Sequence, residues 1–522
     1  MAFPLEVRAH RHARHVVAPG LALLLVLATL PAAGLAGDAR LPAAAPAGDG
    51  QIALATTIRP RVSGIQPLTH EVYGYLPYWR LDAGTAGQIH YELVSTIAFF
   101  GLGIKATGDL DTAWVGYKEY VGDDAAAVTN AAHDRGVRVV PTFQLFDMGT
   151  GAPKMSAFLG STTAQDRFIA QALELMAARQ ADGAGLDFEP VGALAARAPQ
   201  FVAFVARFRH AMKARFPSAT LVNATSAGAT QALVEGIVPY VDRQMIMTYN
   251  YHSKSSAVAG PIAPLDNATR TVKMHITKML AWAPAKSILM GVPYYGYDWP
   301  VTTSAPYATV RSNKTTYGKV TSVTYASARA FLAAHPRVVR RYDAVQGSGW
   351  YTYWSSAYGT YREVYFEEER SLAAKYDYAI LSGLGGVGIW TLGNDAGYDA
   401  LWNVLRSKFY APVHAVTVGG SVALSRSSGN VIATVRGNAK NMGTVPERGR
   451  WWWAIRTPGG TIVKSGSWTT NTLYPGRSIA HAVRLTLGRA TSLRAGTYTL
   501  RVLFITSAKI WRSPLIGFRQ PY

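Results

Sequence analysis

The central part of the chain alternates short apolar runs with stretches of helical periodicity. From about residue 67, eight runs of six to nine apolar-rich residues recur, and between most of them apolar residues repeat every three to four positions. Strands joined by helices lie parallel in one sheet, and eight such units are typical of a (β/α)₈ barrel. We therefore predict an α/β fold, a TIM barrel over 67–410. Its strands are expected at 71–79, 94–100, 137–143, 183–188, 219–225, 243–249, 287–294 and 384–390.

The segment between the last two runs is longer than a single connecting helix. The predicted barrel exceeds the ~250 residues typical of the fold, and most of the excess lies at about 300–370, where Tyr, Thr and Ser are frequent. We interpret it as an α+β insertion on the C-terminal face, where it forms one wall of a cleft.

The helical period disappears after about residue 411. Segments such as N-V-I-A-T-V-R (430–436) alternate apolar and polar residues, and turn sequences such as T-P-G-G (457–460) separate them. This pattern predicts an all-β, immunoglobulin-like sandwich over 411–522. The same alternation places Trp452 on the opposite face from Trp451 and Trp453, so at least one of the three is expected in the core.

The first 66 residues show two further patterns. Residues 1–36 have a basic start, an apolar run at 21–30 and then small residues, which predicts a signal peptide cleaved near Ala33 or Ala36. An uncleaved anchor is the alternative, although the run is shorter than the ~20 residues of a membrane span. Residues 37–66 are rich in Ala, Pro and Gly and predict a linker. We expect a secreted or cell-envelope protein.

The charge of the chain is concentrated at its C-terminal end. The net charge is +21, and residues 411–522 hold 15 Lys and Arg against one acid, Glu447, whereas 67–410 hold 31 against 27. This favours an anionic cell-envelope polymer as a partner of 411–522; a basic domain without a specific ligand is the alternative. The chain has no cysteine, which excludes thiol nucleophiles and disulfides. Neither metal-ligand spacing nor a dinucleotide fingerprint is present, so we expect no metal and no cofactor.

Three acids lie in and beside the fourth predicted strand, within A-D-G-A-G-L-D-F-E-P (181–190). Side chains alternate along a strand, so Leu186 and Phe188 should face the helices while Asp187 and Glu189 face inward. They would then lie near the C-terminal rim, where barrel enzymes hold their catalytic groups. A polar loop end, with Asp182 as a turn or capping residue, is the alternative.

Several stretches resemble one family. D182-G183-A-G185-L-D187-F-E189 resembles the D-G-x-D-x-D-x-E signature of glycoside hydrolase family 18, the chitinase family. G-Y-L-P-Y-W is similar to its first strand, M-T-Y-N to its M-x-Y-D, G-V-P-Y-Y-G-Y-D-W to its seventh strand and G-V-G-I-W to its eighth. The resemblance covers about 70–410. It implies a glycosidase that cleaves β-1,4 bonds beside N-acetylglucosamine with retention, using the 2-acetamido group of the substrate as the nucleophile.

The resemblance also implies roles for individual residues. Glu189 matches the general acid and base, and Asp187 the residue that orients the acetamido group and stabilises the positive intermediate. Tyr249 would hydrogen-bond the acetamido oxygen, and Trp390 would form the floor beneath the sugar; ordinary barrel packing is the alternative for both. Asp182, Gly183 and Gly185 occupy structural positions of the motif. Further substrate-binding candidates are Asn250, Tyr75, Gln144 and Tyr295.

Two residues depart from the family pattern. Gly185 stands where an aspartate usually partners the next acid, so proton sharing between stacked acids would be lost. Asn250 replaces the aspartate of M-x-Y-D, which removes a charge near Glu189. The loss should lower the pKa of Glu189 and move the activity optimum toward acid.

The sequence therefore predicts a secreted glycosidase acting on chitin, chitooligosaccharide or peptidoglycan. Two alternatives stay open. One is a lectin-like barrel that binds N-acetylated glycans without cleaving them. The other is an envelope attachment protein that acts through its basic C-terminal domain.

Overall fold

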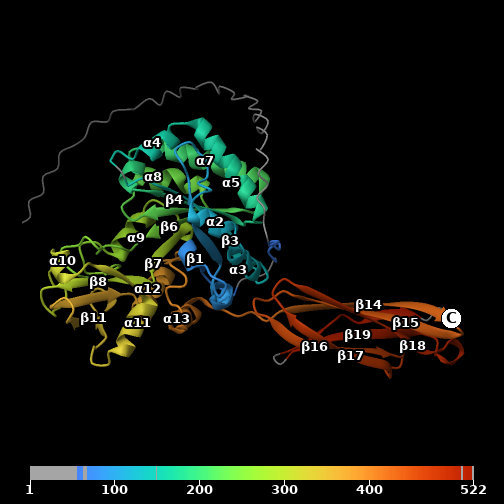
Figure 1. The fold of residues 1–522 in the computed structure, drawn as a ribbon. Helices are drawn as coiled ribbons and strands as arrows, with labels where there is room; N and C mark the ends of the chain where they lie inside the picture. The colour runs from blue at the N-terminus through green and yellow to red at the C-terminus, as the bar shows by residue number, and fades with distance from the viewer. Residues whose placement is uncertain (1–55, 63–66, 149, 507–508, 520–522) are drawn as a thin grey trace, which may run out of the picture. The chain divides into compact units, whose positions relative to one another are not determined.

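The computed structural model describes residues 56–62, 67–148, 150–506 and 509–519 (Figure 1). The predicted signal peptide at 1–36 and most of the predicted linker at 37–66 lie outside the described residues.

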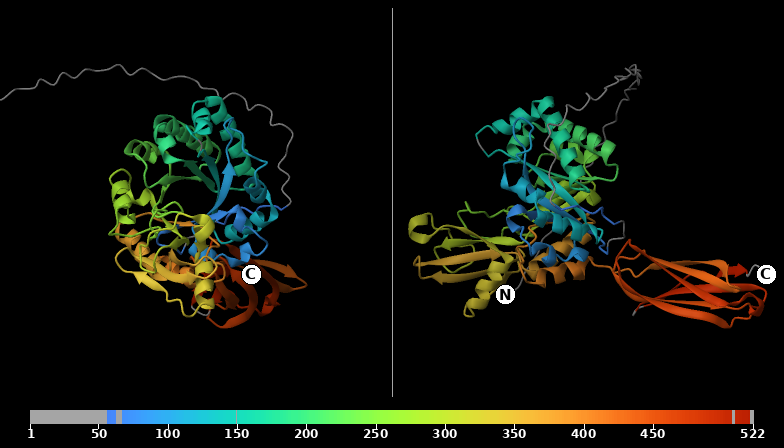
Figure 2. Two further views of the ribbon diagram at one scale, coloured as in Figure 1. Left: turned by 60° about the vertical axis from the view of Figure 1, so that its left-hand side comes forward. Right: turned by 45° about the vertical axis from the view of Figure 1, so that its right-hand side comes forward.

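Eight parallel strands form a closed barrel, which confirms the predicted fold (Figures 1 and 2). Around the barrel their order is β1-β13-β7-β6-β5-β4-β3-β2. Each strand lies within a few residues of its expected position, because its apolar run is buried on both faces. The strands are β1 (Glu71–Pro77), β2 (Thr96–Gly103), β3 (Arg138–Phe146), β4 (Gly183–Glu189), β5 (Thr220–Ser226), β6 (Arg243–Met247), β7 (Ile288–Pro293) and β13 (Gly386–Trp390).

Helices follow most of these strands and surround the barrel (Figure 2). The α-helices are α1 (Thr85–Gln88), α2 (Val115–Val121), α3 (Asp123–His133), α4 (Pro153–Leu159), α5 (Thr162–Ala178), α6 (Val191–Ala195), α7 (Ala198–Arg215), α8 (Gln231–Ile237), α9 (Val272–Leu280), α12 (Glu369–Leu381) and α13 (Ala400–Phe409). Short 3₁₀ turns are η1 (Tyr78–Arg80), η2 (Tyr91–Leu93), η3 (Val238–Tyr240), η4 (Ala285–Ser287) and, after the barrel, η5 (Ala490–Ser492).

The alternation predicted for β4 is present. Leu186 and Phe188 are buried in the layer between strands and helices. The Phe188 ring lies 5.2 Å from that of Phe201 and 5.7 Å from that of Phe204, both on α7. Asp187 and Glu189 point the other way, into the barrel mouth. The helix-side packing therefore fixes the direction of the two acids.

The predicted α+β insertion follows β7 directly. It contains a five-stranded antiparallel sheet in the order β10-β11-β12-β8-β9. An ion pair between the largely buried Arg362 and Asp298, 2.7 Å apart, joins two of its central strands. The insertion begins earlier than the expected 300, because β8 starts two residues after β7 ends. Its elements are β8 (Tyr295–Val301), α10 (Lys314–Tyr317), β9 (Thr321–Thr324), α11 (Tyr325–Ala334), β10 (Arg341–Asp343), β11 (Ser348–Ser355) and β12 (Thr360–Phe366).

Residues after 411 form a β-sandwich, as predicted. One sheet has the order β14-β15-β18, and the other has the order β17-β16-β19-β20, with β21 also paired to β19. Trp451 and Trp453 are buried between the sheets, and Trp452 faces outward and is half-buried, as the alternation indicates. The strands are β14 (Val416–Ser427), β15 (Asn430–Asn441), β16 (Glu447–Arg456), β17 (Ile462–Leu473), β18 (Ser478–Arg489), β19 (Thr497–Thr506), β20 (Ile510–Arg512) and β21 (Ile516–Arg519).

Residues 56–62, inside the stretch interpreted as a linker, pack against the barrel. The Val62 amide donates to the carbonyl oxygen of His133 (3.0 Å), and the Val62 side chain is buried. Arg61 Nε donates to Asp182 Oδ1 (2.6 Å), at the amino end of β4. Asp182 Oδ2 also accepts the Val139 amide (2.8 Å) and lies 3.1 Å from His133 Nε2. The motif residue Asp182 therefore anchors the barrel floor, at the opposite end of β4 from Glu189.

Candidate active site

A cleft with a cavity volume of about 550 Å³ opens where the strands end. The structure brings all eight residues predicted to be catalytic or substrate-binding to this one cleft. They come from strands β1, β3, β4, β8 and β13 and from the loop after β6, so no local stretch of sequence contains the site. They are Tyr75, Gln144, Asp187, Glu189, Tyr249, Asn250, Tyr295 and Trp390.

The two acids differ in burial. Asp187 is only 4% exposed, whereas Glu189, two residues nearer the rim, is half-buried. Burial raises the pKa of Asp187 well above its usual range, and the nearby Glu189 carboxylate raises it further. Burial also raises the pKa of Glu189. A protonated carboxyl group therefore persists here to higher pH than at an exposed acid, as a general acid requires.

The sequence leads to the expectation that Asn250, in place of aspartate, lowers the pKa of Glu189. The pKa of Glu189 is shifted upward, and burial is the cause. Asn250 lines the cleft with a left-handed backbone (φ 64°), and its Oδ1 accepts a hydrogen bond from the Tyr297 hydroxyl (2.8 Å). The downward effect of asparagine relative to aspartate at this position stays a prediction.

The space beside Gly185 is filled by two side chains from neighbouring strands. A Cβ atom at residue 185 would lie 3.1 Å from the Tyr73 hydroxyl and 3.0 Å from Thr142 Oγ1. Both oxygens are buried, and neither they nor Asp187 Oδ1 meet a hydrogen-bond partner within the described part of the chain. Neutral hydroxyls thus occupy the floor beneath Asp187. Tyr73 and Thr142 are not among the residues predicted from the sequence, although their inward positions in β1 and β3 are a signal that could have found them.

Aromatic rings form one side of the cleft. Trp390, at the end of β13, has its ring 4.7 Å from that of Phe100 and 5.3 Å from that of Tyr75, both nearly edge-on. Trp79 lies 6.5 Å from Trp390 and is 51% exposed. An apolar wall with an exposed edge suits the face of a pyranose ring. Trp114 also lines the cleft, and no pattern marks it in the sequence because it lies in a loop before α2.

Tyrosines line the wall on the insertion side. Tyr249 and Tyr295 have ring centroids 6.4 Å apart, in an edge-to-face arrangement. Burial raises the pKa of Tyr249 well above its usual range, and the charges of Asp187 and Glu189 add to the effect. The Tyr249 hydroxyl therefore keeps its proton and can donate a hydrogen bond to a substrate oxygen.

Over residues 56–62, 67–148, 150–506 and 509–519, no group of three or more His, Asp or Glu side chains is placed to hold a metal ion. None of the helices in the described part of the chain is both long enough and apolar enough to cross a membrane.

Comparisons with known proteins place this geometry in context. The sequence model of "Glycosyl hydrolases family 18" matches residues 144–395. A putative sporulation-specific glycosylase of Bacillus subtilis is 26% identical over 308 residues, which are 57% of this chain and 66% of that protein. A cortical fragment-lytic enzyme of Bacillus anthracis is 25% identical over 266 residues, 49% of this chain and 56% of that protein. The chain thus spans less than two thirds of the length of these relatives.

The fold is shared with solved structures. The crystal structure of a chitinase from Cycas revoluta, in complex with an N-acetylglucosamine trimer, superposes with a TM-score of 0.56 at 17% identity. The match covers 65% of this chain and 99% of the chitinase. At that identity the likeness concerns the fold of the barrel and its insertion.

Proposed function

We propose that the barrel, whose residues 144–395 match the sequence model of the glycosyl hydrolases of family 18, cleaves β-1,4 bonds beside N-acetylglucosamine in an N-acetylated polysaccharide. One observation carries the proposal: a half-buried acid and a fully buried acid project from one strand into an aromatic cleft that also holds a protonated tyrosine. A cleft that only bound sugar would not need two buried carboxyl groups, each of which is costly to bury.

The arrangement suits catalysis assisted by the substrate. Asp187 and Glu189 leave the same strand on the same side, about 6.6 Å apart along it, so neither faces the other across a bound sugar ring. Schemes with two enzyme carboxylates need one on each side of the scissile bond. A nucleophile from the substrate, the carbonyl oxygen of its 2-acetamido group, removes that requirement.

In the first step the Glu189 carboxyl group gives its proton to the glycosidic oxygen as the bond to the anomeric carbon breaks. The acetamido oxygen bonds to that carbon and a positive oxazolinium forms. Asp187 orients the acetamido N–H and offsets the positive charge, and the Tyr249 hydroxyl positions the acetamido oxygen. In the second step the Glu189 carboxylate takes a proton from water, and the water oxygen bonds to the same face of the anomeric carbon that the leaving group occupied. The bond between that carbon and the acetamido oxygen breaks at the same time, which restores the neutral 2-acetamido group.

The stereochemistry of the product tests this mechanism. Two successive inversions at one carbon give net retention, so the first product from a β-linked oligomer should be the β-anomer. Proton NMR of the anomeric region, recorded before mutarotation, distinguishes the two products. An initial α-anomer would require direct attack by water and would refute the substrate-assisted mechanism.

The substrate and site of action are part of the proposal. Two relatives are named for sporulation and for cortical fragments, and one structural neighbour is a chitinase. Peptidoglycan, chitin and chitooligosaccharide all contain the required 2-acetamido sugar. The basic and then apolar sequence of 1–36 supports export, and action in the cell envelope, although those residues lie outside the described part.

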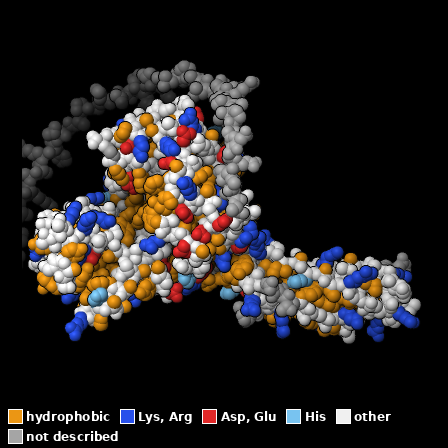
Figure 3. Space-filling model, viewed as in Figure 1, with side chains coloured by type: hydrophobic (Ala, Val, Ile, Leu, Met, Phe, Trp, Pro, Cys, Tyr) orange, Lys and Arg blue, Asp and Glu red, His pale blue; other side chains and the backbone are white. Residues whose placement is uncertain are grey.

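We propose in addition that the sandwich attaches the enzyme to an anionic polymer of the envelope. Its one acid, Glu447, is 3% exposed and lies 2.7 Å from His414 Nδ1. The 15 basic residues of 411–522 therefore far outnumber the acids of their own domain, although Arg477 Nη2 lies 3.0 Å from Asp134 Oδ1 of the barrel. The face of the sandwich visible in Figure 3 shows blue side chains and no red ones. Unneutralised charge of one sign attracts polyanions.

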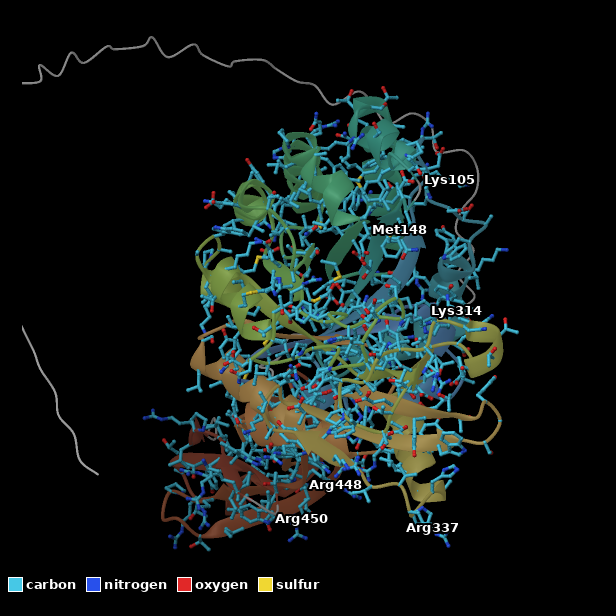
Figure 4. The ribbon with its side chains drawn as sticks, turned by 90° about the vertical axis from the view of Figure 1, so that its left-hand side faces the viewer. Lys105, Met148, Lys314, Arg337, Arg448 and Arg450 are labelled. Atoms are coloured by element: carbon cyan, nitrogen blue, oxygen red, sulfur yellow. The ribbon has the colours of Figure 1, made fainter. Side chains whose placement is uncertain are left out.

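The outer face of β16 gives a test of this attachment. Arg448 and Arg450 are exposed there (Figure 4), and Trp452 follows them on the same face by the alternation of the strand. The double substitution Arg448→Gln, Arg450→Gln should weaken binding to bacterial cell walls by about 10-fold or more, since each cation near an anionic surface contributes about 1 kcal/mol. Binding should also weaken as salt rises. A pull-down assay at several salt concentrations measures both effects.

A matched variant controls for net charge. Lys314→Gln with Arg337→Gln removes the same charge from exposed positions of the insertion. It should change wall binding less than 2-fold, a bound of about 0.4 kcal/mol. Equal weakening by the two double variants would refute the assignment to the sandwich.

A further inference from the structure

A second groove continues from the active-site cleft. It has a cavity volume of about 870 Å³ and shares two lining residues with the cleft, Tyr251 and Arg270. The remaining lining is mostly polar, with hydroxyl, amide and imidazole groups able to bind a hydrated chain. Its own polar residues include Asp266, Asn267, Lys273 and Gln346.

Arg270 lies at the junction of the two spaces. It is exposed, two residues before the start of α9, and its guanidinium carbon is 5.2 Å from the centre of the Tyr251 ring. The Tyr251 hydroxyl lies 3.0 Å from His275 Nδ1 on α9, which holds the ring in place. Stacking on a fixed ring orients the planar guanidinium while its N–H groups stay free to donate.

The charge of Arg270 is not neutralised by the protein. Within the described residues, no carboxylate lies within ion-pair distance of its guanidinium, whereas the other cation of the groove, Lys273, is 2.7 Å from Asp266 Oδ2. The charged residues that line the cleft itself are Asp187, Glu189 and Arg270. Arg270 is therefore the cation beside the reaction site that is available to a ligand.

We propose that Arg270 binds a carboxylate of the substrate, so that the groove selects an N-acetylated glycan carrying carboxylates, as peptidoglycan does, over neutral chitin. This inference rests on the proposed glycosidase function. The planar guanidinium suits bidentate pairing with a carboxylate. A neutral glycan gains nothing from this charge, whereas an anionic glycan that enters a cleft with two acids needs a cation to offset their repulsion.

Two carboxylates of peptidoglycan could reach this position. One is the lactyl carboxylate of muramic acid, which is free on strands without peptide. The other belongs to the peptide stem, where the lactyl group is an amide. A comparison of peptide-free strands with intact peptidoglycan distinguishes the lactyl carboxylate from the carboxylate of the peptide stem.

The test compares carboxylated substrates with neutral ones, and each carboxylated polymer with its own amidated form. Wild type, Arg270→Gln and Arg270→Lys are assayed on N-acetylglucosamine oligomers, on peptide-free glycan strands, on intact peptidoglycan and on each polymer after amidation of its carboxylates. We expect Arg270→Gln to lower kcat/KM about 10-fold on at least one of the two carboxylated polymers, mainly through KM, and less than 2-fold on neutral or amidated substrates. Arg270→Lys should recover part of the loss, because it keeps the charge and loses the planar geometry.

Lys273→Gln provides the matched control. It removes the same charge from the same groove, so general attraction of an anionic chain predicts equal losses for the two variants. Direct pairing at Arg270 predicts a clearly larger loss for Arg270→Gln. The proposal would be overturned by equal losses for the two variants or by no loss for Arg270→Gln. It would also be overturned if Arg270→Gln lost the same activity on neutral and carboxylated substrates, because Arg270 would then act by supporting the Tyr251 ring.

Failure of the glycosidase proposal gives a different result. If wild type cleaves none of these substrates, the dissociation constants of carboxylated and amidated strands are measured for wild type and Arg270→Gln. Tighter binding of the carboxylated strand that Arg270→Gln abolishes would support the subsite without catalysis. Equal binding of the two strands by wild type would overturn it.

Discussion

Glu189→Gln should lower kcat on N-acetylglucosamine oligomers by about 10³- to 10⁴-fold, at the upper end of what a general acid contributes. Glutamine has nearly the same shape as a protonated glutamic acid, and it has no proton to transfer to the leaving oxygen. Burial raises the pKa of Glu189, so in the wild type that proton is present at mildly acidic pH. Reducing-sugar release at pH 4–8, on oligomers and on peptidoglycan, measures the effect.

Binding should survive this substitution, because the aromatic wall and Tyr249 remain in place. The dissociation constant of an oligomer should therefore change by less than a factor of about 3, whereas kcat collapses. Glu174→Gln is a suitable control, since Glu174 lies at the surface of α5 in an exposed ion pair with Arg215. If Glu189→Gln kept a tenth of wild-type activity, another group would have to be the acid. If wild type and variant bound equally and neither cleaved, the lectin-like alternative would be correct.

Asp187→Asn should have the second largest effect, a decrease in kcat of about 10²- to 10³-fold, comparable to the loss of one group that stabilises developing charge. Asparagine can still accept the acetamido N–H, but it cannot offset the positive oxazolinium. Asp187 is 4% exposed, so water cannot take over this role. Single-turnover kinetics isolates the chemical step.

The pH profile of Asp187→Asn adds a second measurement. Catalysis needs a protonated Glu189, so activity falls as pH rises through the pKa of that group. In the wild type, removal of the last proton from the pair is opposed, because two negative charges would then share one buried site. Without the Asp187 charge, Glu189 should lose its proton at lower pH, and the alkaline limb should move toward acid. A limb that stayed in place would show that burial alone sets the pKa of Glu189.

The barrel could be predicted from the sequence because its signal is repetitive. Eight apolar runs and their helical connections each constrain the others, so no single ambiguous run decides the fold. The inward direction of Asp187 and Glu189 also follows locally, since Leu186 and Phe188 must reach the α7 side of the strand. The predicted strand boundaries and the predicted start of the insertion were less accurate. Strand hydrogen bonds can extend beyond an apolar run, and the composition of the run does not indicate how far.

What could not be predicted depends on contacts between distant segments. Residues 56–62 look like a linker by composition, but the Arg61 guanidinium lies against Asp182, 121 positions later. The hydroxyls beneath Asp187 come from Tyr73 and Thr142, on two other strands. Arg270 lies in a loop without periodicity, and its importance appears only when its distance to carboxylates is known.

The lone, buried acid of the sandwich has a consequence for how the enzyme would be controlled. The cations of the sandwich are twelve arginines and three lysines. Side chains of these two types in general titrate above about pH 10. Histidines number only two in this domain, His414 and His481, against these fifteen cations. Retention at the wall would therefore vary with ionic strength and hardly with acidity, whereas turnover varies with acidity through Asp187 and Glu189. Ionic strength would therefore control where the enzyme resides, and acidity would control how fast it works.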